Sequence, residues 1–198
     1  MNEKILKSKL VPVVVFKTLE DVTPMMDALK QGGVLTAEIC FRTECSYDGL
    51  VKAIKEYPDM LIGAGTIINV EQCENAINAG AKFIVGPGFN KEIALYCQNK
   101  NVDYIPGVVT PTEIMNALEV GLNYLKFFPA GVFGGLKAMD ALVAAFPQVK
   151  FMPTGGVNLD NLKDYIDKKY IFAVGGSFLM KGDVVNNCIT ANKIVKGE

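Results

Sequence analysis

The hydrophobic positions of this chain form short apolar runs separated by longer amphipathic stretches, and this alternation continues along its whole length. Short apolar runs bounded by glycine or proline predict strands buried on both faces, as in a parallel sheet. We expect strands at 10–16, 35–41, 60–67, 82–85, 103–109, 124–128, 149–153 and 171–174. Helical periodicity predicts helices at 2–9, 20–31, 46–57, 70–79, 91–100, 111–120, 135–146, 159–168 and from 183 onward.

The alternation of about eight strands with about eight helices, joined by short connections, decides the expected fold class. Parallel βα units of this number close most naturally into an α/β (β/α)₈ TIM barrel. We therefore predict a single barrel domain over residues 1–198, with a short N-terminal helix. An open doubly wound sheet is the second choice, because the turn at 17–20 lacks the Gly-x-Gly-x-x-Gly fingerprint of that fold.

The amino-acid composition excludes several classes of function. Half of the 198 residues are hydrophobic and the net charge is -1, so we expect no nucleic-acid partner and no anionic membrane partner. No apolar run approaches a membrane span of about 18 residues, and the N-terminus lacks a signal-peptide pattern. The five cysteines are scattered and odd in number, which favours reduced thiols in a cytoplasmic protein. The absence of histidine excludes Ser-His-Asp catalysis and argues against a transition-metal site.

One charged side chain stands inside an otherwise apolar strand: Lys126, in the run Tyr124 to Phe128. It either extends its ammonium group into water near the strand end or finds a buried partner. Glu38, Val85 and Lys126 each follow a helix-ending glycine by five residues. Because alternate strands of a barrel contribute side chains to one interior layer, we expect Glu38 and Lys126 to face each other there.

The predicted strand ends carry groups suited to an anionic ligand, at the face where such barrels place their chemistry. Arg42 has the parity of Glu38 and can bind a carboxylate at the barrel mouth, and Thr66 offers a hydroxyl group. Two Gly-Gly pairs, at 155–156 and 175–176, are expected in the last two βα turns. Backbone N–H groups there would bind a phosphate. Whether Lys17, at the end of the first strand, reaches the mouth stays open.

Taken together, the motifs of this chain resemble the KDPG/KHG aldolase family. The resemblance rests on the segments 38–43 (Glu-Ile-Cys-Phe-Arg-Thr), 63–66 (Gly-Ala-Gly-Thr), 86–88 (Gly-Pro-Gly), 105–108 (Ile-Pro-Gly-Val), 126–130 (Lys-Phe-Phe-Pro-Ala), 153–156 (Pro-Thr-Gly-Gly) and 175–177 (Gly-Gly-Ser). It implies a homotrimeric (β/α)₈ barrel that works through a Schiff base, without metal or other cofactor. The implied substrate is a small phosphorylated keto acid, 2-keto-3-deoxy-6-phosphogluconate (KDPG), cleaved to pyruvate and glyceraldehyde 3-phosphate. 4-Hydroxy-2-oxoglutarate (KHG) is a further candidate.

The resemblance also assigns roles to residues. It implies that Lys126 forms the Schiff base and that Glu38 is the general acid and base. Residues implied at the pyruvate end are Arg42, Thr66, Pro87 and Phe128, which packs beside the lysine. Residues implied at the distal, phosphate end are Thr154, Gly155, Gly156, Gly176 and Ser177. One departure is Ile39-Cys40-Phe41 before Arg42, where the family more often has a Val-Thr-Leu type of run.

Other functions stay open at this point. A phosphosugar isomerase or synthase on the same barrel would use the glycine turns without a buried lysine. A phosphosugar-binding protein without activity would bind the ligand and release no aldehyde. Within the aldolases, the galactonate epimer of KDPG is an alternative substrate, and the Thr154 hydroxyl group favours KDPG.

Overall fold

The computed structural model describes residues 1–198. Its strands are β1 (Leu10–Val14), β2 (Thr36–Cys40), β3 (Leu61–Gly65), β4 (Phe83–Val85), β5 (Asp103–Ile105), β6 (Gly107–Val108), β7 (Tyr124–Phe127), β8 (Lys150–Pro153) and β9 (Val174–Gly176). Its α-helices are α1 (Glu3–Ser8), α2 (Val22–Gln31), α3 (Ser46–Glu56), α4 (Val70–Asn78), α5 (Lys91–Asn99), α6 (Pro111–Glu119), α7 (Gly135–Ala145), α8 (Leu162–Ile166) and α9 (Val184–Lys196). Two 3₁₀ helices complete the set, η1 (Leu19–Asp21) and η2 (Phe178–Met180).

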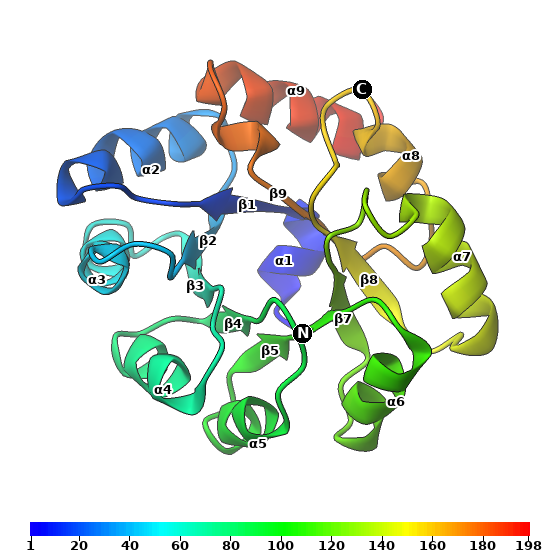
Figure 1. Cartoon of the computed structure of the whole chain (residues 1–198). Coiled ribbons are helices and arrows are strands. Elements are labelled where there is room, and N and C mark those ends of the chain that lie inside the picture. The colour runs from blue at the N-terminus through cyan, green and yellow to red at the C-terminus, as the bar shows by residue number, and fades with distance from the viewer.

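All ladders are parallel, and the strands form a sheet that curls into a half-barrel with α2 to α9 on its outer side (Figure 1). The ladders comprise a six-stranded sheet, β5-β4-β3-β2-β1-β9, and a three-stranded sheet, β6-β7-β8. The strand expected at 103–109 is divided into β5 and β6 at Pro106, because proline has no N–H to donate to a ladder. β5 therefore pairs with β4, and β6 pairs with β7.

Side chains alternate between two apolar cores, as period-two strands require. Outward residues such as Ile39 and Leu125 pack against the helices in the larger core. Inward residues such as Val11, Phe83 and Met152 form a smaller core with Ile5 of α1. Because α1 directly precedes β1, this helix covers the end of the half-barrel where the strands begin. The charged groups described below therefore lie above an apolar floor.

The last βα unit differs from the prediction. The strand expected at 171–174 is Val174–Gly176, and β1 pairs with Gly175 through Val11 and with Gly176 through Pro12. These glycines are therefore strand residues and not a turn. A side chain on Gly175 would overlap the Thr154 hydroxyl group, so glycine here permits the close approach of β9 to β8.

The helix expected at 159–168 is reduced to the short α8 (Leu162–Ile166). The carboxamide oxygen of Asn158 accepts hydrogen bonds from the N–H groups of Asp160, at 3.0 Å, and Asn161, at 3.1 Å. Asparagine side chains that bond to nearby backbone favour turns over helix, so the chain turns before α8 begins.

Candidate active site

Lys126 and Glu38 meet in the interior of the curled sheet. Lys126 Nζ lies 3.3 Å from Glu38 Oε1, and the two residues are 2% and 0% exposed. The expectation that they share an interior layer is confirmed. Both are inward positions of their strands, β7 and β2, whose outward neighbours face the helices. Charged groups at this depth are found only where a partner offsets part of the desolvation cost, and each supplies that partner to the other.

The Glu38 carboxylate fits a space left by a glycine of the neighbouring strand. Gly65 of β3 lies beside it, and a side chain at this position would overlap the Glu38 carboxyl group. Glu38 Oε2 is buried without a hydrogen-bond partner. Buried polar atoms are rarely left unsatisfied, and those that are often belong to sites that do chemistry.

Cys40 follows Glu38 on the same inward face of β2. Its Sγ lies 3.6 Å from Glu38 Oε1. Burial, with the nearby charge of Glu38, raises the pKa of the Cys40 thiol to about 12. The thiol is therefore protonated at neutral pH and can only donate to the carboxylate.

Phe128 connects this buried pair to an open cleft of about 400 Å³. Lys126 Nζ lies 5.1 Å from the centre of the Phe128 ring. The cleft is lined by Val13, Arg42, Phe128, Thr154, Gly155, Gly156, Val157, Asn158, Gly176, Ser177, Phe178 and Lys181. A ligand in the cleft would therefore have the lysine at its inner end.

Arg42 is held at the mouth by the neighbouring βα turn. Its Nε donates a hydrogen bond to Thr66 Oγ1 at 2.8 Å. Thr66 has φ +58°, a conformation that residues with branched side chains rarely adopt. The backbone N–H of Arg42 donates a hydrogen bond to Ser46 Oγ at 3.2 Å. These contacts fix the guanidinium group where a carboxylate of a bound ligand could be paired with it.

The opposite wall of the cleft is made by the end of β8. Gly155 and Gly156 have φ +86° and +90°, values open to glycine at little cost. The carbonyl groups of Thr154 and Gly155 accept hydrogen bonds from the N–H groups of Ala130 and Gly131, at 2.9 and 2.8 Å. Thr154 is 5% exposed and its Oγ1 has no partner, so a polar group of a ligand could bond to it.

Lys126 and Glu38 lie behind Phe128 and do not line the cleft, and Thr66 meets it only through its bond to Arg42. Two further residues considered from the sequence lie outside the cleft. Pro87 does not line it, and its carbonyl oxygen instead lies against Gly107, where a side chain would overlap it. Lys17 does not line it either, and its backbone N–H donates to Asp21 Oδ2 at 2.8 Å. The cleft is also lined by residues that the sequence motifs did not predict: Val13, Val157, Asn158, Phe178 and Lys181. The signal available for the last four was that they closely follow the glycine pairs at 155–156 and 175–176.

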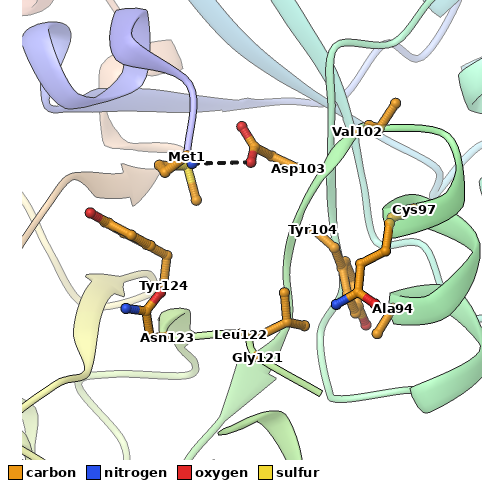
Figure 2. Close-up of a pocket in the computed structure, with 11 residues that line it drawn as sticks. Met1, Ala94, Cys97, Val102, Asp103, Tyr104, Gly121, Leu122, Asn123 and Tyr124 are labelled. Carbon is orange, nitrogen blue, oxygen red and sulfur yellow. Dashed lines mark ion pairs between the residues drawn. The ribbon is translucent and has the colours of Figure 1, made fainter.

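A second cavity, of about 280 Å³, lies at the N-terminal ends of β5 and β7. Figure 2 shows the Met1 amino group directed at the Asp103 carboxylate, with a separation of 3.3 Å. Neither Lys126 nor Glu38 lines this cavity. Elsewhere, no group of three or more His, Cys, Asp or Glu side chains is placed to hold a metal ion. None of the helices has the length and apolar character to cross a membrane.

Comparison with known proteins shows the family to which the chain belongs. The family model described as KDPG and KHG aldolase matches residues 1–195, and the chain belongs to this family. It is 40% identical over 178 residues to a 2-dehydro-3-deoxy-phosphogluconate aldolase of Treponema pallidum, covering 90% of this chain and 85% of that protein. It is likewise 40% identical over 175 residues to the KHG/KDPG aldolase of Escherichia coli K12, covering 88% and 82%.

A solved structure is similar over the full length. KDPG aldolase from Legionella pneumophila, with pyruvate captured as a covalent carbinolamine intermediate, matches with a TM-score of 0.88 and 35% identity. The match covers 100% of this chain and 98% of that one.

Proposed function

We propose that this protein is a Schiff-base aldolase that cleaves KDPG to pyruvate and glyceraldehyde 3-phosphate, and KHG to pyruvate and glyoxylate. The observation that carries the proposal is the buried pair of Lys126 and Glu38, 3.3 Å apart, at the inner end of a cleft. Family membership and the carbinolamine captured in the Legionella relative support it.

Lys126 is the nucleophile in this proposal. An amine attacks a ketone only in its neutral form, and the adjacent Glu38 carboxylate can take up the proton from Lys126 Nζ. Attack on the C2 carbonyl of the substrate gives a carbinolamine, and loss of water then gives an iminium ion. The iminium accepts the electron pair of the C3–C4 bond while the C4 hydroxyl group loses its proton. The aldehyde leaves, and an enamine of pyruvate stays on the lysine.

Glu38 moves the protons that these steps require. Its Oε1 is within hydrogen-bond reach of Lys126 Nζ, and its Oε2 has no partner in the protein. One oxygen can therefore exchange a proton at the nitrogen while the other serves the substrate or a water molecule. Protonation of the enamine at C3 and hydrolysis of the resulting imine release pyruvate and restore Lys126.

The cleft holds the substrate at both ends. Arg42, with Thr66 beside it, pairs with the carboxylate group, and Phe128 packs against the pyruvyl part. Thr154, Gly155, Gly156, Gly176 and Ser177 form the distal, phosphate-binding end. Binding at both ends would keep the C2 carbonyl beside Lys126. The attack of the amine would then occur within one bound complex and would not need a separate encounter of the two groups. Pro87 borders the pyruvate end from outside the cleft.

Trapping the imine tests the proposal. Borohydride added with pyruvate should reduce the imine to a stable adduct, which intact mass and peptide mapping would place on Lys126. The variant Lys126→Met should give no adduct, whereas Lys150→Met, which removes a half-buried lysine at the start of β8, should react as the wild type does. An unmodified Lys126 after treatment would refute the aldolase and would favour a phosphosugar isomerase or a non-catalytic binding protein.

The strand arrangement supports a complete eight-stranded barrel formed by residues 1–198 as one domain. Pro106 separates β5 from β6 by a single residue, so the two sheets are continuous through the chain at that point. On the other side, bridges join Phe151 to Ile171 and Thr154 to Gly175. Slow amide exchange on β6, β7 and β9 alike would support closure, and rapid exchange along β9 and β6 would contradict it.

A homotrimer and a cytoplasmic location complete the proposal. Ile68, Leu95 and Met115 expose 59%, 51% and 60% of their surface, and large exposed apolar side chains suit a subunit interface. Sedimentation should give three times the chain mass, and Met115→Glu should weaken assembly. The five unpaired cysteines fit a reducing compartment, which cell fractionation would test.

A further inference from the structure

Lys181 lies at the distal end of the cleft, beyond the residues that sequence motifs identify. It follows η2 and lines the cleft together with Ser177, Gly155 and Gly156. The Asn187 carboxamide donates to the carbonyl oxygen of Lys181 at 2.6 Å. The backbone of this position is therefore anchored to α9, while the long side chain is exposed and free to turn toward the cleft.

The charged side chains that line the cleft are all positively charged. Among its lining residues, Arg42 and Lys181 are the only charged side chains, and there is no carboxylate. Lys181 takes part in none of the ion pairs of the protein. The nearest acidic residue along the chain, Asp183, accepts a hydrogen bond from the N–H of Asn186 at 3.0 Å as the cap of α9. The Lys181 ammonium group therefore has no ion-pair partner within the protein.

The two cations come from separate parts of the wall. Arg42 follows β2, and Lys181 follows β9 and η2. A ligand with one anionic group can use one of them, whereas a ligand with a carboxylate at one end and a phosphate at the other can use both. A phosphate group carries up to two negative charges. An unpaired ammonium group therefore attracts a phosphate more strongly than it attracts a neutral hydroxyl or aldehyde group.

We infer that the ammonium group of Lys181 binds the substrate phosphate and makes this enzyme prefer phosphorylated over unphosphorylated 2-keto acids. This inference rests on the proposed aldolase function, and it assigns the preference for phosphorylated substrates to one residue. KDPG carries its phosphate on C6, whereas the second carboxylate of KHG is attached directly to C4, next to the cleaved bond. The loss of Lys181, at the distal end of the cleft, should therefore affect KDPG much more than KHG. Because the side chain is far from the reacting bond, the change should appear in KM and leave kcat unchanged.

The test compares Lys181→Met with Lys181→Arg and with a matched control, Lys193→Met. Lys193 is an exposed lysine of α9 outside the cleft, so its loss changes the net charge equally. For KDPG, we expect kcat/KM of Lys181→Met to fall about 10-fold, the scale of one charge-assisted contact. Lys181→Arg should recover most of the loss, and Lys193→Met should match the wild type. For KHG, whose second carboxylate lies closer to the cleaved bond than the KDPG phosphate does, Lys181→Met should lose much less than it does for KDPG, and the other two variants should match the wild type.

Salt and inorganic phosphate give further readouts. KM for KDPG should rise with ionic strength more steeply in the wild type than in Lys181→Met, because salt screens exposed charges. Inorganic phosphate should inhibit KHG cleavage by the wild type and inhibit Lys181→Met about 10-fold less.

Several outcomes would overturn the inference. An equal loss with both substrates would show that Lys181 only maintains the turn, and equal losses in Lys181→Met and Lys193→Met would reduce its role to net charge. Failure of the aldolase proposal itself looks different, because wild-type protein would then cleave neither substrate and would trap no pyruvate with borohydride.

Discussion

Glu38 Oε1 accepts a hydrogen bond from Lys126 Nζ at 3.3 Å, although 88 positions separate the two residues in the chain. Both side chains are buried, and each lies on an inward face of its strand. A carboxylate and an amine in this arrangement can exchange a proton without solvent between them. The function proposed for this protein depends on proton exchange across that contact. The first prediction therefore concerns a variant of Glu38 that cannot take up a proton.

Replacing Glu38 with glutamine should keep the shape of the side chain and remove its ability to take up a proton. We expect kcat for KDPG cleavage to fall by about 10²- to 10⁴-fold, the usual contribution of general acid–base catalysis. KM should change little, because Arg42 and the distal end of the cleft, which hold the two anionic groups of the substrate, are unchanged. Borohydride trapping of pyruvate should become slower and still occur on Lys126. A kcat equal to that of the wild type would contradict the proposed role.

Gly65 should prove necessary for the position of Glu38. A methyl group on Gly65 would overlap the Glu38 carboxyl group, so Gly65→Ala should displace this carboxyl and cost about 1–3 kcal/mol of unfolding free energy. Gly88→Ala is the matched control, since its added methyl group would meet no atom within 4 Å. We expect kcat to fall in Gly65→Ala alone, as measured by steady-state kinetics together with urea unfolding. Normal activity of Gly65→Ala would show that the Glu38 carboxyl group functions without the space left by Gly65.

The Cys40 thiol should resist alkylation in the folded protein. Its pKa is raised to about 12 by burial and by Glu38, and only the thiolate is a good nucleophile. Iodoacetamide at pH 8 should modify the half-buried Cys45 first and should reach Cys40 only after unfolding, as peptide mass spectrometry would show. Labelling of Cys40 at the rate of Cys45 in native protein would contradict this environment.

The same pKa shift predicts a dependence of stability on alkaline pH. An unfolded thiol titrates near 9.0 and the folded Cys40 near 12, so the folded state holds the proton more tightly. The contribution of Cys40 to stability is therefore present in full below pH 9 and is lost as the pH rises through about 12. Cys40→Ser should flatten the decline of unfolding free energy over this interval.

The start of α6 should show the opposite dependence. Burial acts to raise the pKa of the Glu113 carboxyl, but hydrogen bonds from the N–H groups of Val109 and Thr110 and from the Thr110 hydroxyl outweigh it, so the pKa is lowered. This stabilisation is present above the ordinary pKa of 4.5 and is lost as the pH falls through the folded value. Glu113→Gln should therefore be less stable than the wild type at pH 7 and equal to it in strong acid.

A second change separates the cap from the charge. Thr110→Ala should cost about 0.5–2 kcal/mol, as removal of a helix N-cap does. Unlike that of Glu113→Gln, most of this cost should persist in acid, because a hydroxyl group does not titrate there. Urea unfolding at both pH values would check each expectation, and equal pH profiles for the two variants would contradict the assignment.

Much of the fold could be predicted because its signals are local. Apolar runs such as that of β1 and helical periodicity such as that of α3 are complete within a few residues of the chain. The parity of Glu38 and Lys126 after their glycines is local too, and it was enough to predict their meeting. The family motifs added residues of the cleft, among them Arg42 and Thr154.

Local residue patterns were sufficient to predict the order of strands and helices, the inward direction of Glu38 and Lys126, and the family that the chain resembles. They did not show that Gly175 belongs to a strand, that the Arg42 side chain bonds to Thr66, or that Lys181 lines the cleft. Side-chain direction follows from periodicity within one strand, whereas ladder pairing and the walls of a cleft depend on the register between segments far apart in the chain.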